Sequence, residues 1–136
     1  MSDCIFCKII AKELPAHKIY EDDEVMAFLD IHPVSRGHTL VIPKKHFNDL
    51  VNTPPEVVAN LMAIVQKITP SIIEAVAATA FNIGINNGSE AGQVINHTHI
   101  HIIPRAKDDG LNMWPEQPSA TSDIETLAKK IKEKIA

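Results

Sequence analysis

The segment from His97 to Ile103 constrains the fold more than any other, because polar and apolar residues alternate along it. Strand side chains point to opposite faces in turn, so a strand here would place His97, His99 and His101 on one face. The Cα atoms of neighbouring histidines would lie about 6–7 Å apart. Three imidazoles this close cannot all be protonated at low cost, which favours neutral rings near pH 7. A solvent-facing polar strand that happens to use histidine is the plainer alternative.

The remaining segments predict a mixture of helices and antiparallel strands. An acidic run at residues 21–24 separates two apolar stretches, which indicates a hairpin. Helices are expected at residues 3–12, with Asp3 as N-cap, and from about Ser122 to the end of the chain. Strands are expected at residues 19–20, 25–29, 39–42, 81–86 and 97–103. This order favours an α+β fold with an antiparallel five-stranded meander sheet.

The longest helix is predicted to begin at Thr53. Thr53, Pro54 and Glu56 have the spacing of N-cap, N1 and N3 in a capping box. Pro70 lies inside the helical pattern, and because it has no amide hydrogen we expect a kink or a break there. One buried face is predicted from aliphatic residues at three- and four-residue steps, namely Val57, Leu61, Ile64, Val65, Ile68 and Ile72.

Length and charge narrow the class of protein. A chain of 136 residues can form one domain with its own core. Thirteen Lys and Arg against seventeen Asp and Glu give a net charge of −4, which argues against general nucleic-acid binding. No run approaches eighteen apolar residues and the N-terminus is polar, so neither a membrane span nor a signal peptide is expected. The predicted compartment is the cytoplasm, where two cysteines would be thiols or metal ligands.

Two kinds of chemistry fit neutral histidines on one strand face. Catalytic zinc can use two such histidines and a third ligand, but no carboxylate lies near this strand in the sequence. Upstream, Asn86 and the loop 88–92 offer amides and flexible backbone that suit phosphate oxygens. A histidine nucleophile beside such a loop indicates phosphoryl or nucleotidyl transfer through a covalent histidine intermediate.

The triad and several other segments resemble one known family. His-x-His-x-His followed by two apolar residues is the signature of the histidine triad (HIT) superfamily. Similarity to its nucleotide-binding, phosphoramidase-type (Hint-like) branch, and to zinc-binding bacterial members, extends over residues 5–10, 28–31, 40–46, 86–88 and 92–93. The resemblance implies a single HIT domain over residues 1–136, with a core at 3–115 and a tail and helix at 116–136. It also implies a HIT-like fold whose sheets join in a homodimer.

The resemblance implies a purine nucleotide of the AMP type bound at the triad strand. His99 is expected to attack the α-phosphorus, His101 to bind phosphate oxygens, and His97 to fix the tautomer of His99 through its backbone carbonyl. His46 corresponds to a fourth histidine that packs beside the triad. Further phosphate-side contacts are expected from Asn86, Gly92, Gln93 and the backbone of Val94.

Ribose and base contacts are also implied. Asp30 is expected to bind the ribose, because a carboxylate can accept hydrogen bonds from both hydroxyls. The alternative role for Asp30 is a turn or cap residue before Pro33. The apolar slot for the base is expected from Ile5, Phe6, Ile9, Phe28 and Ile31, which without the resemblance are ordinary core residues.

Two features depart from the family pattern. Val94 stands where many relatives carry Ser or Thr, whose hydroxyl can assist the leaving group, and an aliphatic side chain cannot do so. The segment 104–118 is longer than in the shortest relatives. Within it, Met113-Trp114-Pro115 resembles a tail element that approaches the partner subunit's site.

Cys4 and Cys7 would face one side of the first helix, because they are three residues apart. Alone this spacing is a moderate zinc signal, and two small buried thiols are the alternative. Zinc-binding proteins that resemble this sequence complete the site with two histidines, which here are His46 and His97. Such a closed site would be structural and would pin the helix to the sheet. The chemistry itself would need no metal.

These inferences lead to a nucleotide-binding hydrolase that cleaves adenosine 5′-phosphoramidate-type substrates through a nucleotidyl-histidine intermediate. A dinucleoside polyphosphate hydrolase and a non-catalytic, zinc-stabilised nucleotide-binding module stay open as alternatives. Neither a membrane nor a specific nucleic acid is expected as a partner. A homodimer is expected, because the long helix carries a second apolar stripe formed by Val58, Met62 and Ile73.

Overall fold

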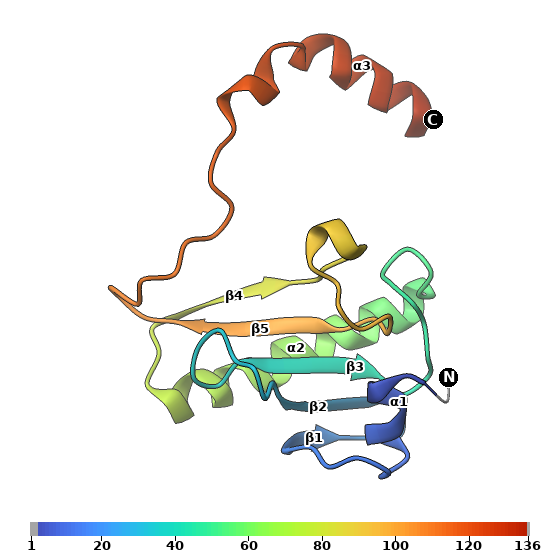
Figure 1. The fold of residues 1–136 in the computed structure, drawn as a ribbon, viewed down its shortest axis with the longest axis vertical. Helices are drawn as coiled ribbons and strands as arrows, with labels where there is room; N and C mark the ends of the chain where they lie inside the picture. Colours follow the sequence, from blue (N-terminus) through green and yellow to red (C-terminus); the bar gives the residue numbers. More distant parts are fainter. Residues whose placement is uncertain (1–2, 136) are drawn as a thin grey trace.

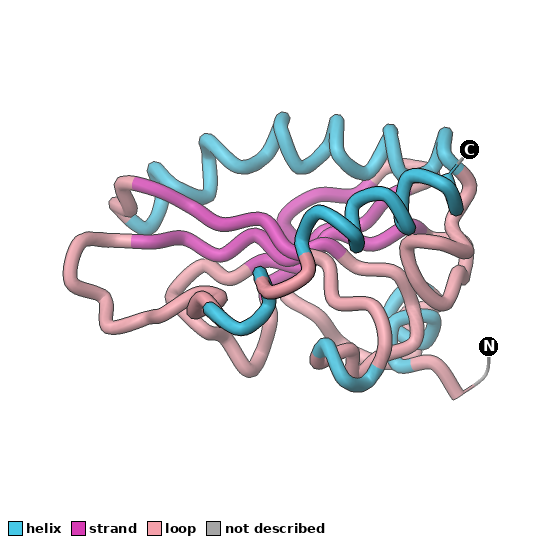
Figure 2. The backbone as a smooth tube through the Cα atoms, turned by 90° about the horizontal axis from the view of Figure 1, so that it is seen from above, coloured by secondary structure: helices cyan, strands magenta, loops and turns pink. Residues whose placement is uncertain are grey.

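One antiparallel sheet carries a long helix on one face and short segments on the other (Figures 1 and 2). The computed structural model describes residues 3–135. Along the chain it forms α1 (Ile5–Ile10), β1 (Lys18–Glu21), β2 (Val25–Leu29), β3 (Thr39–Pro43), α2 (Pro55–Val76), β4 (Ala80–Gly84), the 3₁₀ turn η1 (Ser89–Ala91), β5 (Ile100–Arg105), the 3₁₀ turn η2 (Pro118–Thr121) and α3 (Ile124–Ile135). The predicted α+β class with a five-stranded antiparallel sheet is confirmed.

The strand order places β5 inside the sheet. The first three strands form a meander, and β5 then lies between β3 and the edge strand β4, in the order β1-β2-β3-β5-β4. On its two sides His101 pairs with Leu40 of β3 and with Gly84 of β4. β5, which carries His101, is therefore held by hydrogen bonds on both sides, which gives its side chains fixed positions.

Alternation along β5 divides its side chains between two faces. Ile100 and Ile102 are fully buried against α2, where they join a core cluster with Leu61, Ile64 and Val65. The predicted buried face of α2 is confirmed. Although α2 has the length and hydropathy that a membrane span requires, this face packs on the sheet as a core helix does. The other sheet face carries the histidines and a second core cluster, formed by Phe6, Met26, Phe28, Leu40 and Ile42.

Three predicted element bounds are wrong at the ends nearest the site. β5 begins at Ile100 rather than His97, because the amide of Thr98 donates to the carbonyl of Phe47 outside the sheet. β4 correspondingly ends at Gly84. The N-cap of α1 is Cys4 rather than Asp3, and its sulfur accepts a hydrogen bond from the Cys7 amide at 3.4 Å.

The predicted capping box of α2 does not form. Pro54 is the N-cap, with no side-chain cap hydrogen bond, and Thr53 lies outside the helix. The Thr53 hydroxyl is 2.7 Å from the hydroxyl of buried Thr98, a partner that lies far away in the sequence. Of the kink or break predicted at Pro70, the break does not occur, because α2 continues through Pro70 to Val76.

The chain after β5 leaves the sheet as an arm, which we define as residues 106–135. It extends past the β4 edge and ends in α3, which stands away from the rest of the chain in Figure 1. No residue of α3 is buried. The arm is therefore placed by its root at the end of β5 rather than by packing of its helix.

Gly37 provides a test of how tightly the turn before β3 is packed. Its φ is +89°, and an added Cβ would lie 2.8 Å from Cγ1 of Val76. We expect Gly37→Ala to lower the free energy of unfolding by about 1–3 kcal/mol, because it adds both backbone strain and a clash. Urea denaturation measures this change. Gly84→Ala is the control, since nothing lies within 4 Å of its Cβ position; equal loss in both variants would contradict the packing argument.

Candidate active site and metal centre

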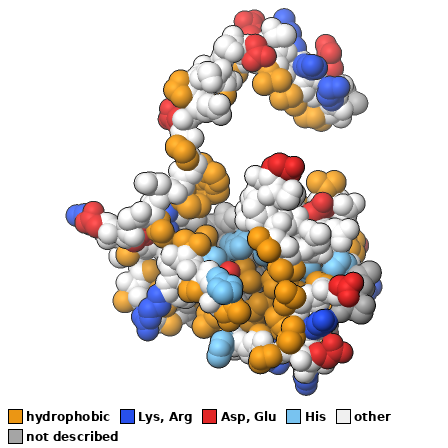
Figure 3. All heavy atoms as spheres, viewed as in Figure 1, with side chains coloured by type: hydrophobic (Ala, Val, Ile, Leu, Met, Phe, Trp, Pro, Cys, Tyr) orange, Lys and Arg blue, Asp and Glu red, His pale blue; other side chains and the backbone are white. Residues whose placement is uncertain are grey.

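A cavity of about 360 Å³ lies on the histidine-bearing face of the sheet. Figure 3 shows histidine side chains among hydrophobic ones on this face. Ten of the predicted binding residues line the cavity, namely Ile5, Phe6, Ile9, Phe28, Asp30, Ile31, Gly92, Val94, His99 and His101. The fold thus brings the expected base slot, Asp30 and two triad histidines into one concave site.

His99 lines this cavity with its ring held in one tautomer. Its Nδ1 lies 2.6 Å from the carbonyl oxygen of His97, and because a carbonyl only accepts, Nδ1–H is the donor. A neutral His99 ring therefore carries its lone pair on Nε2. Phe6 packs edge-on against the ring, with 5.1 Å between the ring centroids. The lone pair on a fixed imidazole is what a nucleophile requires.

A series of two hydrogen bonds sets the tautomer of His101. The Val34 amide donates to Nδ1 of His38 at 3.0 Å, so a neutral His38 carries its proton on Nε2. This Nε2–H lies 2.9 Å from Nδ1 of His101 and donates to it. His101 must then carry its own proton on Nε2. That buried nitrogen has no hydrogen-bond partner among residues 3–135. An acceptor group of a ligand would satisfy it.

Burial keeps these rings neutral. It lowers the pKa of His101 to about 4 and that of His97 to about 4, because the charged form loses its hydration. Burial also lowers the pKa of His99 and of His38. At pH 7 the cavity therefore presents a lone pair from His99 and an N–H from His101 rather than imidazolium charge.

Asp30 combines the two roles that the sequence left open. Its Oδ1 accepts a hydrogen bond from the His32 amide at 2.8 Å, which is the turn role. Its Oδ2 lies 3.7 Å from Nε2 of His38, and Asp30 lines the cavity. One carboxylate oxygen thus holds the turn, while the other belongs to the site.

The loop between β4 and β5 is held from within. The side chain of Gln93 is buried, accepts from the Gly88 amide at 2.9 Å, and donates to the carbonyl of Asn48 at 2.6 Å. Gly92 has φ +91° and lines the cavity, and the exposed Val94 side chain also lines it. Gln93 and Asn86, which were expected to contact phosphate, are not among the lining residues, and the side-chain amide of Gln93 instead positions the loop.

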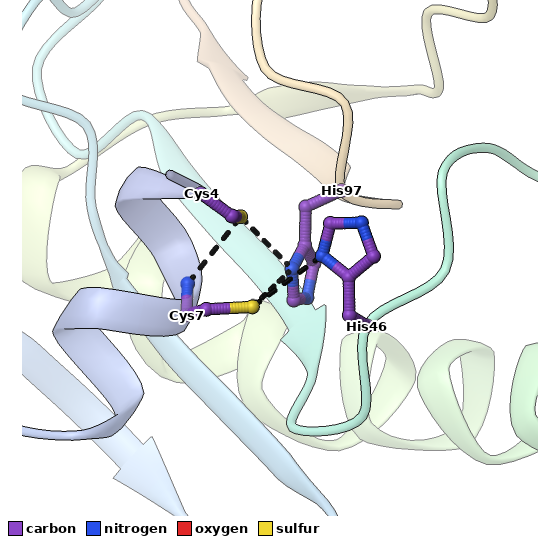
Figure 4. A group of neighbouring side chains, drawn as sticks. All are labelled: Cys4, Cys7, His46 and His97. Atoms are coloured by element: carbon purple, nitrogen blue, oxygen red, sulfur yellow. Dashed lines mark hydrogen bonds between the residues drawn. The ribbon is translucent and has the colours of Figure 1, made fainter. Parts of the chain in front are cut away.

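The second group joins α1 to the sheet beside His99. Figure 4 shows Cys4, the N-cap of α1, and Cys7 within that helix facing His46 and His97, and one ligand atom from each lies within 4.8 Å of all the others. His97 donates Nε2–H to the Pro43 carbonyl at 2.8 Å, so its Nδ1 lone pair faces the sulfurs of Cys4 at 3.4 Å and Cys7 at 3.6 Å.

His46 is oriented in the same way. Its Nε2 lies 3.0 Å from Oδ1 of Asn48 and donates to it, so its Nδ1 lone pair lies 3.4 Å from the Cys7 sulfur. Tetrahedral zinc with ordinary bond lengths sets sulfur and nitrogen ligands about 3.6 Å apart. The four residues fit such an ion. Burial raises the pKa of the Cys7 thiol to about 11, so a bound cation would have to draw the proton off.

Comparisons with known proteins decide the family. A model of the HIT domain matches residues 11–108. This chain belongs to the HIT family. Adenylylsulfatase HINT3 of Arabidopsis thaliana is 52% identical over 110 residues, which cover 81% of this chain but only 56% of the plant protein. Adenosine 5′-monophosphoramidase hnt1 of Schizosaccharomyces pombe is 39% identical over 134 residues, covering 97% of this chain and 98% of the yeast protein.

Solved structures share the fold, among them one of a histidine triad family protein. A protein of Streptococcus mutans UA159 superposes with a TM-score of 0.90 at 40% identity, covering 100% of this chain and 87% of that one. A zinc-bound histidine triad family protein of Mycobacterium smegmatis gives a TM-score of 0.78 at 44% identity, covering 85% of this chain and 84% of that one. The HIT-like fold predicted from the sequence is therefore confirmed.

His38 is the site residue of this HIT protein to which sequence reasoning gave no role. It is buried, and its ring lies 5.1 Å from that of His101 between centroids. The sequence held no signal for this role, because His38 is placed by the pairing of Leu40 with His101, two residues further along, and this pairing is seen only in the structure. His46, expected beside the triad, does lie there, with its ring centroid 4.9 Å from that of His97.

Proposed function

We propose that this chain hydrolyses adenosine 5′-phosphoramidate-type substrates through a nucleotidyl intermediate on His99. Membership of the HIT family and the phosphoramidase named among its relatives support a nucleotide hydrolase. The observation that carries the proposal is the tautomer of His99, whose Nδ1–H is committed to the His97 carbonyl so that the Nε2 lone pair is left for attack. The base would lie in the apolar slot and the ribose on Asp30.

In the first step Nε2 of His99 attacks the α-phosphorus, and the bond from phosphorus to the leaving amine breaks. The unpartnered Nε2–H of His101 can donate to a phosphate oxygen, which stabilises the charge that grows there in the transition state. In the second step water attacks the nucleotidyl-histidine, which releases the nucleotide and restores neutral His99. Because Val94 cannot donate a proton, the leaving amine takes its proton from water in this scheme.

We predict that His99→Ala lowers kcat by at least about 10³-fold while the Kd for AMP changes by less than about threefold, since the nucleophile acts mainly in the transition state. A fluorogenic adenosine phosphoramidate measures turnover, and rapid quenching with mass spectrometry detects one nucleotide on His99. His17→Ala, an exposed histidine outside the site, is the control. Comparable turnover in His99→Ala would exclude the mechanism, and faster cleavage of a diadenosine polyphosphate would favour the other hydrolase.

We further propose one structural zinc ion per chain, held by Cys4, Cys7, His46 and His97. The support is the fit of the donor set, whose two histidines both turn Nδ1 to the sulfurs, together with the zinc-bound mycobacterial relative. When bound, the ion supplies cross-linking of α1 to the sheet rather than catalysis. The ring of His97 would thus bind the metal, while the backbone carbonyl of His97 holds the ring of His99 in its tautomer.

Metal analysis tests the zinc proposal. Protein purified without chelators should contain about one zinc per chain, and Cys4→Ala/Cys7→Ala should contain none, because thiolates are the strongest zinc ligands present. The variant should also unfold at lower urea concentration, since α1 loses its anchor. His17→Ala serves as the control and should keep its zinc. Full zinc occupancy in the double variant, or metal-free wild-type protein, would refute the assignment.

We also propose that two copies associate through the β4 edge and the outer face of α2. An apolar groove lies there, lined by residues that include Met62, Ile73, Phe81 and Ile83, and Phe81 is 48% exposed. Exposed edge strands are usually paired or covered.

Light scattering at micromolar concentration should give a mass of about twice 15.0 kDa. Met62→Glu should shift the protein toward monomer and Ser71→Glu, exposed elsewhere on α2, should not; a monomeric wild type would contradict the proposal.

A further inference from the structure

Cys4 and Cys7 are placed to bond to each other as well as to a metal ion. Cys4 is the N-cap of α1 and Cys7 is the third residue of the helix, positions whose Cα atoms lie about 5–6 Å apart. Disulfides span Cα separations of about 4.4–6.8 Å. The two sulfur atoms lie within 4.8 Å of each other (Figure 4), and that of Cys4 is 3.4 Å from the Cys7 amide nitrogen. Small rotations of the two side chains therefore suffice to form an S–S bond.

A small molecule can reach this pair from solvent. A second cavity, of about 410 Å³, opens beside the cluster and is lined by residues that include Cys4, His46 and Asn48. Both cysteines are half-buried, but Cys7 is not among the residues that line this cavity. An oxidant that enters the cavity therefore meets the sulfur of Cys4 first, and the sulfur of Cys7 lies next to it.

Metal binding and disulfide formation exclude each other at these two sulfurs. With the proposed zinc ion bound, both cysteines are thiolates, which is the form of cysteine that attacks a peroxide. A disulfide sulfur carries no negative charge, so after oxidation only His46 and His97 would remain as ligands. Two ligands are too few for a structural zinc site, which uses four. Oxidation of the pair would therefore release the ion.

We propose that Cys4 and Cys7 form a redox modification site, which hydrogen peroxide converts to a disulfide with release of zinc. The Cys4 thiolate attacks a peroxide oxygen and the O–O bond breaks, which gives a sulfenic acid on Cys4 and a hydroxide ion. The Cys7 thiolate then attacks the Cys4 sulfur, the S–S bond forms, and a second hydroxide ion leaves. The two sulfurs supply the two electrons that reduce the peroxide. This inference rests on the proposed zinc ion and goes beyond it.

Release of the ion would reach the nucleotide cavity through α1. Phe6 packs on the rings of His97 and His99, with 5.8 and 5.1 Å between ring centroids. Ile5 and Ile9 of the same helix line the cavity in which the base is proposed to lie. Loss of the cross-link to the sheet should loosen this wall and weaken nucleotide binding. Attack by His99 should change less, because the backbone carbonyl of His97 rather than α1 holds its tautomer.

Mass spectrometry of the zinc-loaded protein tests the modification site. After treatment with a few equivalents of hydrogen peroxide, the peptide 1–8, which contains both cysteines, should lose about two mass units, the two hydrogen atoms of a dithiol. A chromophoric chelator should report zinc release in parallel, and dithiothreitol should restore the mass. Oxidation confined to methionine, or a disulfide that forms while zinc stays bound, would overturn the inference.

Two single variants test the order of attack. Cys7→Ser should trap a sulfenic acid on Cys4, which dimedone labels, because the second thiolate is missing. Cys4→Ser should give at least about fivefold less label on Cys7, since that sulfur does not line the cavity. The two variants are matched, because each leaves three of the four proposed zinc ligands. Equal labelling of both would contradict the assignment of Cys4 as the attacking sulfur.

Nucleotide binding before and after oxidation tests the link to the active site. The disulfide form should bind AMP with a Kd at least about fivefold higher, with kcat within about twofold, and dithiothreitol with zinc should reverse the change. Cys4→Ser/Cys7→Ser cannot form the disulfide, so peroxide should leave its Kd unchanged. An unchanged Kd in the fully oxidised wild type would overturn the link. Zinc content and turnover of the untreated protein report separately on the zinc ion and the hydrolase, so failure of either is distinguished from failure of the redox site.

Discussion

The hydrogen bonds of His97 are the constraint on which both halves of the site depend. Its ring is fully buried, and Nε2–H donates to the Pro43 carbonyl, which turns Nδ1 toward the two cysteines. Its backbone carbonyl accepts from His99 and so fixes the tautomer of the proposed nucleophile. Because one residue serves both groups, a change in the packing of α1 against His97 would reach His99 directly, and Phe6 on α1 touches both rings.

Much of this arrangement could be predicted from periodicity. The alternation at residues 97–103 gave the two faces of β5 because a strand has only two sides, and the three- and four-residue steps in α2 gave its buried face. The prediction of a capping box at Thr53 was wrong, because the helix start depends on a contact between residues far apart in the sequence. Local spacing cannot show that the Thr53 hydroxyl has a partner in Thr98, which lies 45 positions along the chain.

The role of His38 needed two facts that a sequence does not contain. The first is register, since only the pairing of β3 with β5 places His38 beside His101. The second is the direction of a proton, since the Val34 amide decides which His38 nitrogen can donate. The likeness to the HIT family located the triad and the slot, but the unpartnered N–H on His101 follows only from this chain of hydrogen bonds.

The same reasoning separates two clusters that look alike. Within residues 3–135 both Cys4, Cys7, His46 and His97 and a group of Asp30, His38 and His101 bring potential ligand atoms within 4.8 Å. In the first, backbone and amide oxygens hold the protons of both histidines away from the centre, so lone pairs converge. In the second, the Val34 amide forces the proton of His38 toward His101, where a cation would be repelled. Hydrogen-bond partners outside the clusters, two for the first and one for the second, therefore decide that the first suits a metal ion and the second an anionic phosphate.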